Sequence, residues 1–243
     1  MRKMSLLLGA LAALLYFSHT SITSGPLATF LSQASSAVPS ASASPYMTTD
    51  AARPISWNPC ASIPYVVNFN EAPANAQADL AAAISRIEAA TGLRFVQVGT
   101  TSVIPQSNWT QQQELGRTGW APLIIAFATS AQSNQLTGGT DQLGNGGSAW
   151  VQGPNGKVDV SGSIVIDASA HLAPGFGAGL HLGSLFLHEL GHVVGLDHSS
   201  DPSSFMYPYL GVTSQAITPL DATHLTALTA GRVCRSAPSP AWG

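Results

Sequence analysis

The segment from His188 to His198 constrains this 243-residue chain more than any other feature, and it reads H-E-L-G-H-V-V-G-L-D-H. His188 and His192 are four positions apart. On a helix, which rises about 1.5 Å per residue, this spacing puts both imidazoles on one face, about 6 Å apart along the axis. Zn²⁺ binds His nitrogens at about 2.0–2.1 Å in tetrahedral sites, so the two side chains can share one ion. The segment therefore predicts a helix that carries a metal site.

The neighbouring residues complete the expected site. Gly195 can end the helix in a left-handed conformation, so that the chain turns back and brings His198 in as a third ligand. Glu189 follows the first ligand and can reach the fourth position, where a catalytic zinc keeps a water molecule. Three protein nitrogens plus water form the open arrangement of a catalytic zinc, not the closed one of a structural zinc. We expect His188, His192 and His198 as zinc ligands and Glu189 as the catalytic residue.

The charge of the chain argues against a nucleic-acid partner. Only nine residues are Lys or Arg, and the formal net charge is −3. Phosphate binding needs a basic patch, which this composition does not favour. Charged residues make up 9% of the chain, and so low a charge fits a secreted protein whose surface is built from Ser, Thr, Asn and Gln.

The N-terminal segment predicts export. Arg2 and Lys3 precede an apolar run over residues 6–17. That length suits the hydrophobic region of a signal peptide and is short for a membrane span, which needs about 20 residues. We expect a signal peptide over about residues 1–24 and a secreted or extracellular protein. The alternative is an uncleaved anchor that holds the protein at the cell envelope, which would be its only membrane contact.

The remaining chain divides by composition. Residues 25–54 are rich in Ser, Ala, Thr and Pro, which predicts a disordered linker or a short pro-segment. Residues 55–235 form the expected folded domain, and residues 236–243 a flexible tail. We expect a monomer.

Hydrophobic periodicity predicts an α+β domain with one mixed sheet and helices packed against it. The Gly- and Asn-rich residues 130–147 predict a surface loop. The last helix starts at Thr218 as N-cap with Pro219 in its first turn, and Gly231 ends it. The apolar face of that helix comprises Leu220, Leu225 and Leu228. Strands are expected at 63–69, 94–98, 122–129, 148–152 and 158–167, and the other helices at 74–91 and 177–196.

The chain has two cysteines, Cys60 and Cys234. In an exported chain a pair most simply forms a disulfide. Such a bridge would tie the C-terminal helix to the entry of the domain and close a long loop. Chain-entropy models predict that this stabilises the folded state by several kcal/mol. Zinc binding by these thiolates is a poor alternative, because neither cysteine has a Cys or His neighbour at ligand spacing.

The extended motif, together with the sequence S-F-M-Y-P around Met206, resembles the metzincin metalloproteases. The segments G-L-D-H-S from Gly195 and M-Y-P from Met206 are most similar to the matrixin branch (peptidase M10 type), in a minimal, bacterial-style secreted form. The resemblance covers about residues 182–231. It implies a twisted mixed sheet with an antiparallel edge strand above the cleft, the motif helix below it, and a C-terminal helix. It also makes Met206, in the Met-turn, an apolar floor under the three imidazoles.

These features predict a secreted zinc-dependent endopeptidase that acts on peptide or protein substrates. An extended substrate could add to the edge strand, with residues 144–147 allowing close approach, although a flexible loop explains these glycines equally well. One alternative is a zinc-stabilised, non-catalytic binding protein on a protease-like fold, which would not need Glu189. Another is zinc-dependent hydrolysis of a substrate other than a peptide. The expected substrate strand comprises Ser148, Ala149, Trp150 and Val151.

Several features that matrixins usually carry are absent. No cysteine precedes Cys60, so the pro-segment thiolate that blocks zinc in matrixins is not expected. Residues 130–170 contain no histidine, so a second, structural zinc is not expected either. Pro208 stands where some metzincins have a tyrosine ligand. Ca²⁺ could bind aspartates with loop carbonyls, although scattered surface aspartates are the simpler interpretation. The aspartates concerned are Asp141, Asp159 and Asp167.

The remaining polar residues near the motif have ordinary interpretations. His171, His181 and His224 are expected to be surface or packing residues, because the motif already supplies three ligands. For Asp197 the sequence leaves two roles open, a hydrogen bond to nearby backbone or a salt bridge within the C-terminal part.

Overall fold

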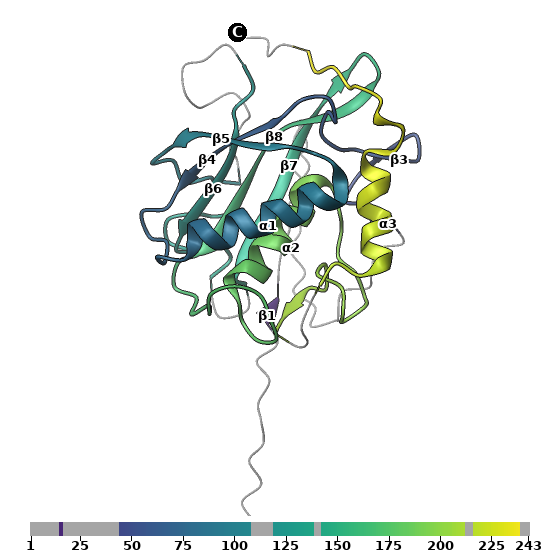
Figure 1. Ribbon diagram of the computed structural model, residues 1–243. Helices are drawn as coiled ribbons and strands as arrows, with labels where there is room; N and C mark the ends of the chain where they lie inside the picture. The colour runs from purple at the N-terminus through teal and green to yellow at the C-terminus, as the bar shows by residue number, and fades with distance from the viewer. Residues whose placement is uncertain (1–14, 17–43, 108–118, 139–141, 212–215, 239–243) are drawn as a thin grey trace, which may run out of the picture.

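A five-stranded mixed sheet with strand order β5-β4-β6-β8-β7 forms the centre of the protein, and helices α1 and α2 cross one of its faces (Figure 1). The computed structural model describes residues 15–16, 44–107, 119–138, 142–211 and 216–238. Strand β7 runs antiparallel to β8 at the sheet edge, and the other pairs are parallel. The expected α+β class with an antiparallel edge strand is confirmed. The strands are β4 (Ile63–Asn68), β5 (Phe95–Thr100), β6 (Leu123–Ala128), β7 (Gly144–Gly153) and β8 (Gly156–Asp167).

The central strands have the apolar sequences that burial on both faces requires. All six residues of β6, L-I-I-A-F-A, are buried. Strand β4 leads into α1 (Ala76–Thr91), which crosses the sheet and returns the chain to the parallel strand β5. A parallel pair needs such a crossover because a tight turn reverses the chain and would make the next strand antiparallel. Gly92 ends α1 in the left-handed conformation (φ 71°), as its position after the apolar pattern predicts.

Strand β7 starts earlier than we expected. Residues 144–147 were assigned to a surface loop, but they are paired with β8 and buried. Their glycines and asparagine hide the strand pattern, since a run without large side chains has no hydrophobic period. The turn at Pro154 and Asn155 joins β7 to β8 as a hairpin, so the strands expected at 148–152 and 158–167 pair with each other.

Helix α2 (Leu182–Val194) carries the motif, and it is shorter than the expected 177–196. Gly175 and Gly179, in the approach to the helix, have φ angles of 77° and 103°. Helical residues do not adopt these angles, so the helix cannot begin before His181, its N-cap. At the other end, Gly195 has φ 115° and ends the helix as expected.

Helix α3 (Pro219–Leu228) begins with a capping box between Thr218 and Asp221, in agreement with the sequence signal. Two details differ from our expectation. The side chain of Leu220 is 57% exposed, so it does not belong to the apolar face, whereas Leu225 and Leu228 are buried. The α-helix also ends at Leu228, and Gly231 (φ 77°) lies in the short 3-10 segment η1 (Ala230–Arg232) that follows.

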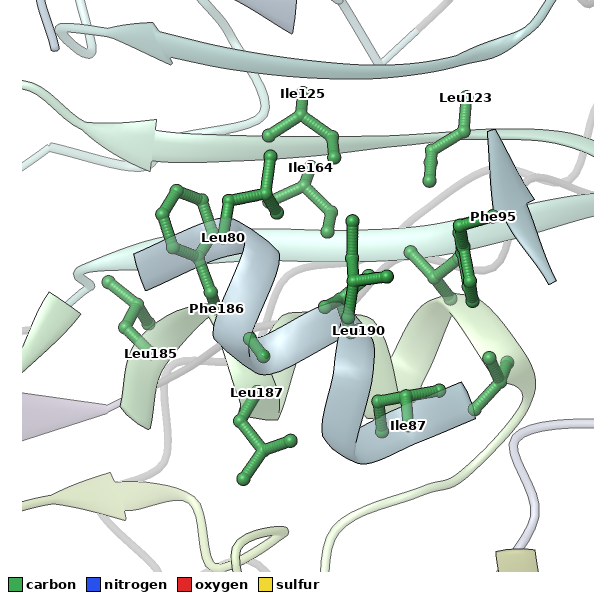
Figure 2. Close-up of a cluster of buried hydrophobic side chains, with 14 of the residues drawn as sticks. Leu80, Ile87, Phe95, Leu123, Ile125, Ile164, Leu185, Phe186, Leu187 and Leu190 are labelled. Atoms are coloured by element: carbon green, nitrogen blue, oxygen red, sulfur yellow. The ribbon is translucent and has the colours of Figure 1, made fainter. Parts of the chain in front are cut away.

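The main core lies between the sheet and the helices. Figure 2 shows Leu80 and Ile87 of α1 and Phe186 of α2 in one cluster with side chains of the sheet. Every residue of α2 is buried. This full burial explains the apolar sequence around the polar motif residues, because a helix enclosed on all sides has no solvated face.

The folded part also includes residues on both sides of the expected domain 55–235. Residues 44–48 lie along the end of α2, where Met47 N–H donates to Gly195 O (3.0 Å) and Asp197 N–H donates to Pro45 O (2.9 Å). Strands β2 (Thr49–Asp50) and β3 (Arg53–Pro54) then form a short hairpin. Residues 44–54 are therefore packed on the domain. At the C-terminal side, Trp120 Nε1 donates to Pro238 O (2.9 Å), so residues 236–238 are packed as well.

The expected signal peptide falls mostly outside the described residues. Its described part is β1 (Leu15–Tyr16), which pairs antiparallel with β9 (Tyr209–Leu210). None of the helices in the described part of the chain has the length and apolarity that a membrane crossing requires.

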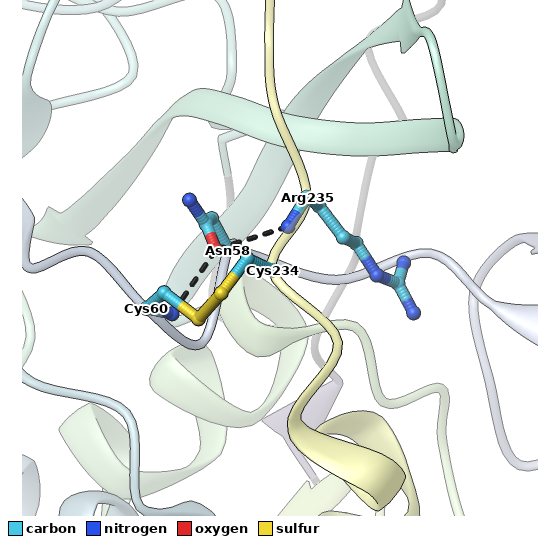
Figure 3. The surroundings of a disulfide bond; sticks show 4 residues. All are labelled: Asn58, Cys60, Cys234 and Arg235. Carbon is cyan, nitrogen blue, oxygen red and sulfur yellow. Dashed lines mark hydrogen bonds between the residues drawn. A yellow bond between two sulfur atoms is a disulfide. The ribbon is translucent and has the colours of Figure 1, made fainter.

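Cys60 and Cys234 form the disulfide that we expected (Figure 3). Both sides of the bridge are held by Asn58, whose Oδ1 accepts hydrogen bonds from Cys60 N–H (3.0 Å) and Arg235 N–H (3.1 Å). The bridge joins the segment before β4 to the segment after α3, which fits its expected role of tying the end of the domain to its entry.

Candidate metal centre

Helix α2 and the turn after it bring three histidines together. His188 and His192 are one turn apart, and their Nε2 atoms lie 3.1 Å from each other. Gly195 turns the chain back so that His198 joins them. One nitrogen from each of the three residues lies within 4.8 Å of the others, and all three residues are buried. The structure thus brings together the three histidines that the sequence predicts as ligands.

Backbone carbonyls orient two of these rings. His188 Nδ1 lies 2.8 Å from Phe205 O, and His192 Nδ1 lies 2.8 Å from Leu196 O. A carbonyl only accepts, so each Nδ1 carries the hydrogen and each Nε2 presents a lone pair. Two lone pairs 3.1 Å apart repel each other unless a cation lies near both. The donor set therefore fits a zinc ion, because His ligands of zinc usually donate their other ring N–H to an acceptor such as these backbone carbonyls.

The sequence could not identify these two acceptors. A backbone carbonyl has no signature in the residue type that carries it, and Phe205 lies beyond the motif. For Asp197, the structure shows the first of the two roles left open, a hydrogen bond to nearby backbone. Its Oδ1 accepts a hydrogen bond from His198 N–H (2.7 Å), so this carboxylate contacts the backbone of the third histidine directly.

Met206 is fully buried beneath the helix, at 1% exposure. A Cβ atom at Gly191 would overlap the Met206 sulfur and would lie 2.8 Å from Cε2 of Phe205. The methionine therefore packs on the helix backbone directly before His192, in keeping with the expected floor. Gly191 makes this contact possible, a role that we did not assign from the sequence.

Glu189 points away from the core and toward β7. Its side chain is fully buried, and neither carboxylate oxygen has a hydrogen bond of good geometry to another described group. Burial raises the pKa of this carboxyl well above its usual range, and the backbone N–H of Gly146 offsets only part of that effect. A buried carboxyl whose pKa is raised in this way is suited to proton transfer near neutral pH.

The residues of the expected substrate strand lie on β7. Ser148 and Ala149 pair with Gly162 and Ser161 of β8 on one side. The opposite side of β7 is an edge of the sheet. An edge strand presents backbone N–H and C=O groups to which an extended chain can add. The geometry is therefore compatible with the expected strand addition.

Asp159 is buried, whereas the sequence suggested a surface residue, and it lies too far along β8 from Asp167 for the two carboxylates to share one ion. The two residues lie near opposite ends of β8, and Asp141 lies outside the described residues. Asp159 is 4% exposed, and burial raises the pKa of its carboxyl from 3.8 to about 7, while Ser148 and Arg235 act in the opposite direction. Within the described part of the chain, the three histidines are the only cluster suited to a metal ion.

The other histidines in the described part of the chain lie at the surface or pack against neighbouring groups, as expected. His181 lies at the start of α2, with its ring nitrogens 2.8 Å from Pro174 O and 3.2 Å from Ala178 O. The ring of His224 packs edge-on against Tyr46, with 6.0 Å between the ring centroids. His171 lines a hollow between Glu71 and Asp167, away from the three-histidine cluster.

Fold and site together define an α+β protein with a three-histidine centre suited to a metal ion, on a helix that is covered by the edge strand of a mixed sheet. The family model described as matrixin matches residues 62–229, and the chain belongs to this family. The resemblance seen in the motif is thereby confirmed over most of the domain.

Individual relatives match shorter parts of the chain. Matrilysin of Felis catus is 41% identical over 95 residues, which are 38% of this chain and 34% of that protein. Matrilysin of Rattus norvegicus is 35% identical over 105 residues, 41% of this chain and 37% of that protein. Macrophage metalloelastase of Oryctolagus cuniculus is 34% identical over 113 residues, 45% of this chain and 21% of that protein. The matched part of the chain thus spans 21–37% of the length of these relatives.

Proposed function

We propose that this protein is a secreted zinc-dependent endopeptidase. The observation that carries the proposal is the buried carboxyl of Glu189 next to a buried cluster of three histidine nitrogens. A site that only held a structural metal would need a fourth protein ligand and no carboxyl kept free beside it. Membership of the matrixin family and similarity to proteins named matrilysin and metalloelastase support the same reaction class.

His188, His192 and His198 would hold the ion through their side-chain nitrogens. When bound, zinc supplies Lewis acidity, which lowers the pKa of water and polarises the scissile carbonyl. The protein contributes the orientation of the rings, through Phe205 O and Leu196 O, and an apolar floor at Met206.

Glu189 would act as the general base and then as the general acid. One carboxylate oxygen takes a proton from the attacking water, and the same group later gives that proton to the leaving amine of the cleaved peptide bond. The enclosure of the carboxyl between α2 and β7 makes proton uptake easier, because burial disfavours the charged form.

The peptide substrate would add to the free edge of β7 along residues 148–151. Strand addition supplies affinity through backbone hydrogen bonds whatever the sequence of the peptide. Such binding suits cleavage within a chain, since it needs no free terminus.

The export route is part of the proposal. A signal peptide over about residues 1–24 would direct the chain to an oxidising compartment, where the Cys60–Cys234 disulfide is stable. Secretion would also keep the proteolytic activity away from the proteins of the producing cell.

One variant tests the reaction and separates it from a binding role. Glu189→Gln should keep one zinc per chain and reduce peptide hydrolysis by about a hundredfold to ten-thousandfold, because general acid–base catalysis contributes about 10²–10⁴. The assay is cleavage of a peptide library, read by mass spectrometry, with and without a zinc chelator. Undiminished cleavage by Glu189→Gln would refute the assignment. A wild-type protein that binds zinc and cleaves no peptide would favour the binding role.

A further inference from the structure

Two glycines of β7 face the carboxylate of Glu189. A Cβ atom on Gly144 would lie 2.8 Å from Oε1 of Glu189, and one on Gly146 would lie 2.8 Å from Oε2. Real Cβ atoms essentially never lie so close to another heavy atom. The two glycines are two positions apart, so their missing side chains belong to the same face of the strand. The carboxylate occupies the space that these side chains would fill.

The space around the carboxylate is closed on several sides. Glu189 has no exposed surface. Ile166 of β8 borders the same position, because its Cδ1 lies 3.3 Å from the Cβ position of Gly144. The helix backbone borders it as well, since Glu189 O lies 2.7 Å from the Cβ position of Gly146. A methyl group on β7 would therefore push the carboxylate out of its place.

We propose that Gly144 and Gly146 are positioning residues for Glu189, so that the edge strand and not only the helix sets where the general base lies. The proposal rests on the function proposed above. It also joins two parts of that function, because the same strand continues into residues 148–151, where the substrate would add. One strand would hold the peptide and set the place of the base that serves it.

Gly144→Ala is the clean test. The three atoms nearest to its methyl group would all be in side chains, those of Glu189 and Ile166, so the fold can adapt while the carboxylate moves. We expect kcat to fall by about tenfold to a hundredfold, the cost of a displacement of about 1 Å in a catalytic group. KM should stay within about twofold and zinc content at one per chain, since neither the ligands nor the strand edge changes.

Two matched glycine variants serve as controls. Gly119 has open space around its Cβ position, so Gly119→Ala should leave kcat and stability unchanged. A Cβ on Gly153, at the far end of β7, would overlap Ser236 O. Gly153→Ala should therefore lower the melting temperature and leave the kcat of the folded protein unchanged. A loss of kcat in Gly153→Ala equal to that in Gly144→Ala would overturn the positioning role.

A double variant distinguishes positioning from general damage. Glu189→Asp shortens the side chain by one methylene and withdraws the carboxylate from β7. In the Glu189→Asp background, Gly144→Ala should therefore reduce kcat by no more than about twofold, because interacting residues are not additive. Equal losses in the two backgrounds would overturn the proposal, as would wild-type kcat in Gly144→Ala itself.

A crystal structure of Gly144→Ala gives a readout that does not depend on activity. A displaced Glu189 carboxylate supports the positioning role, and an unmoved carboxylate overturns it. If the wild-type protein cleaves no peptide, the proposed function fails, and the structure of the variant still decides whether β7 places the carboxylate.

Discussion

Trp57 Nε1 donates a hydrogen bond of 2.8 Å to Val193 O, near the C-terminal end of α2. Both residues are buried. The last carbonyls of a helix have no partner within the helix, and Trp57 supplies one from a segment that precedes the first strand of the main sheet. Helix α2, which carries the motif, is thus held by a residue that is 136 positions away in the chain.

Trp57→Phe should destabilise the protein by about 1–3 kcal/mol, because it leaves a buried carbonyl unsatisfied. Denaturant unfolding of the zinc-loaded protein measures the change. The kcat of the folded variant should equal that of the wild type, since Trp57 does not touch the three histidines. An unchanged unfolding midpoint would show that water replaces the indole.

Removal of the metal should lower the melting temperature. A ligand that binds only the folded state stabilises it by about 2.7 kcal/mol at a hundredfold excess over its dissociation constant. A chelator should therefore lower the melting temperature of the wild type and have no effect on His198→Ala. Calorimetry and metal analysis test both statements. An identical response of the two proteins would contradict His198 as a ligand.

Cys60→Ser combined with Cys234→Ser should cost about 2–5 kcal/mol of unfolding free energy, the range for native disulfides in exported domains. The long loop, with a sequence separation of 174, favours the upper part of that range. Urea unfolding of the double variant provides the measurement. The wild type under reducing conditions serves as the control and should approach the double variant. A midpoint that reduction does not change would contradict a stabilising bridge.

Asp159 should make stability fall as pH rises from about 4 to about 7. Its folded pKa is raised from 3.8 to about 7 by burial, so the folded state binds a proton that the unfolded state has already released in this range. The stabilisation that protonation provides is fully present below pH 3.8 and is lost as pH rises through about 7. Asp159→Asn, a neutral isostere, should remove this slope and be more stable than the wild type at pH 8. Parallel pH dependences of the two proteins would contradict the shift.

The candidate metal site could be predicted from the sequence because the residues that define it lie close together in the chain. Helical spacing places His188 and His192 on one face, and Gly195 marks the turn that brings in His198. The start of α3 was predictable for the same reason, since a capping box lies within four consecutive residues. The central strands were predictable from their continuous runs of apolar residues.

Features that depend on contacts between segments far apart in the chain could not be predicted from the sequence. Residues 44–54 have the composition of a linker, but their backbone hydrogen bonds to Gly195 and Asp197 do not depend on side chains. Residues 144–147 form a strand through backbone pairing with β8, which their glycines do not reveal in the sequence. Asp159 looked like a surface residue because no local pattern shows what the rest of the chain will cover.

The turn between the second and third histidines performs two tasks with the same residue. Leu196 O fixes the ring of His192, and the chain that continues from Leu196 delivers His198 two positions later. Exchanging one apolar residue for another between Val193 and Leu196 keeps both relations. Adding or deleting a single residue there would misdirect one ring and displace another at once. The turn therefore tolerates a change of residue type better than a change of length, except at Gly195, whose positive φ requires glycine.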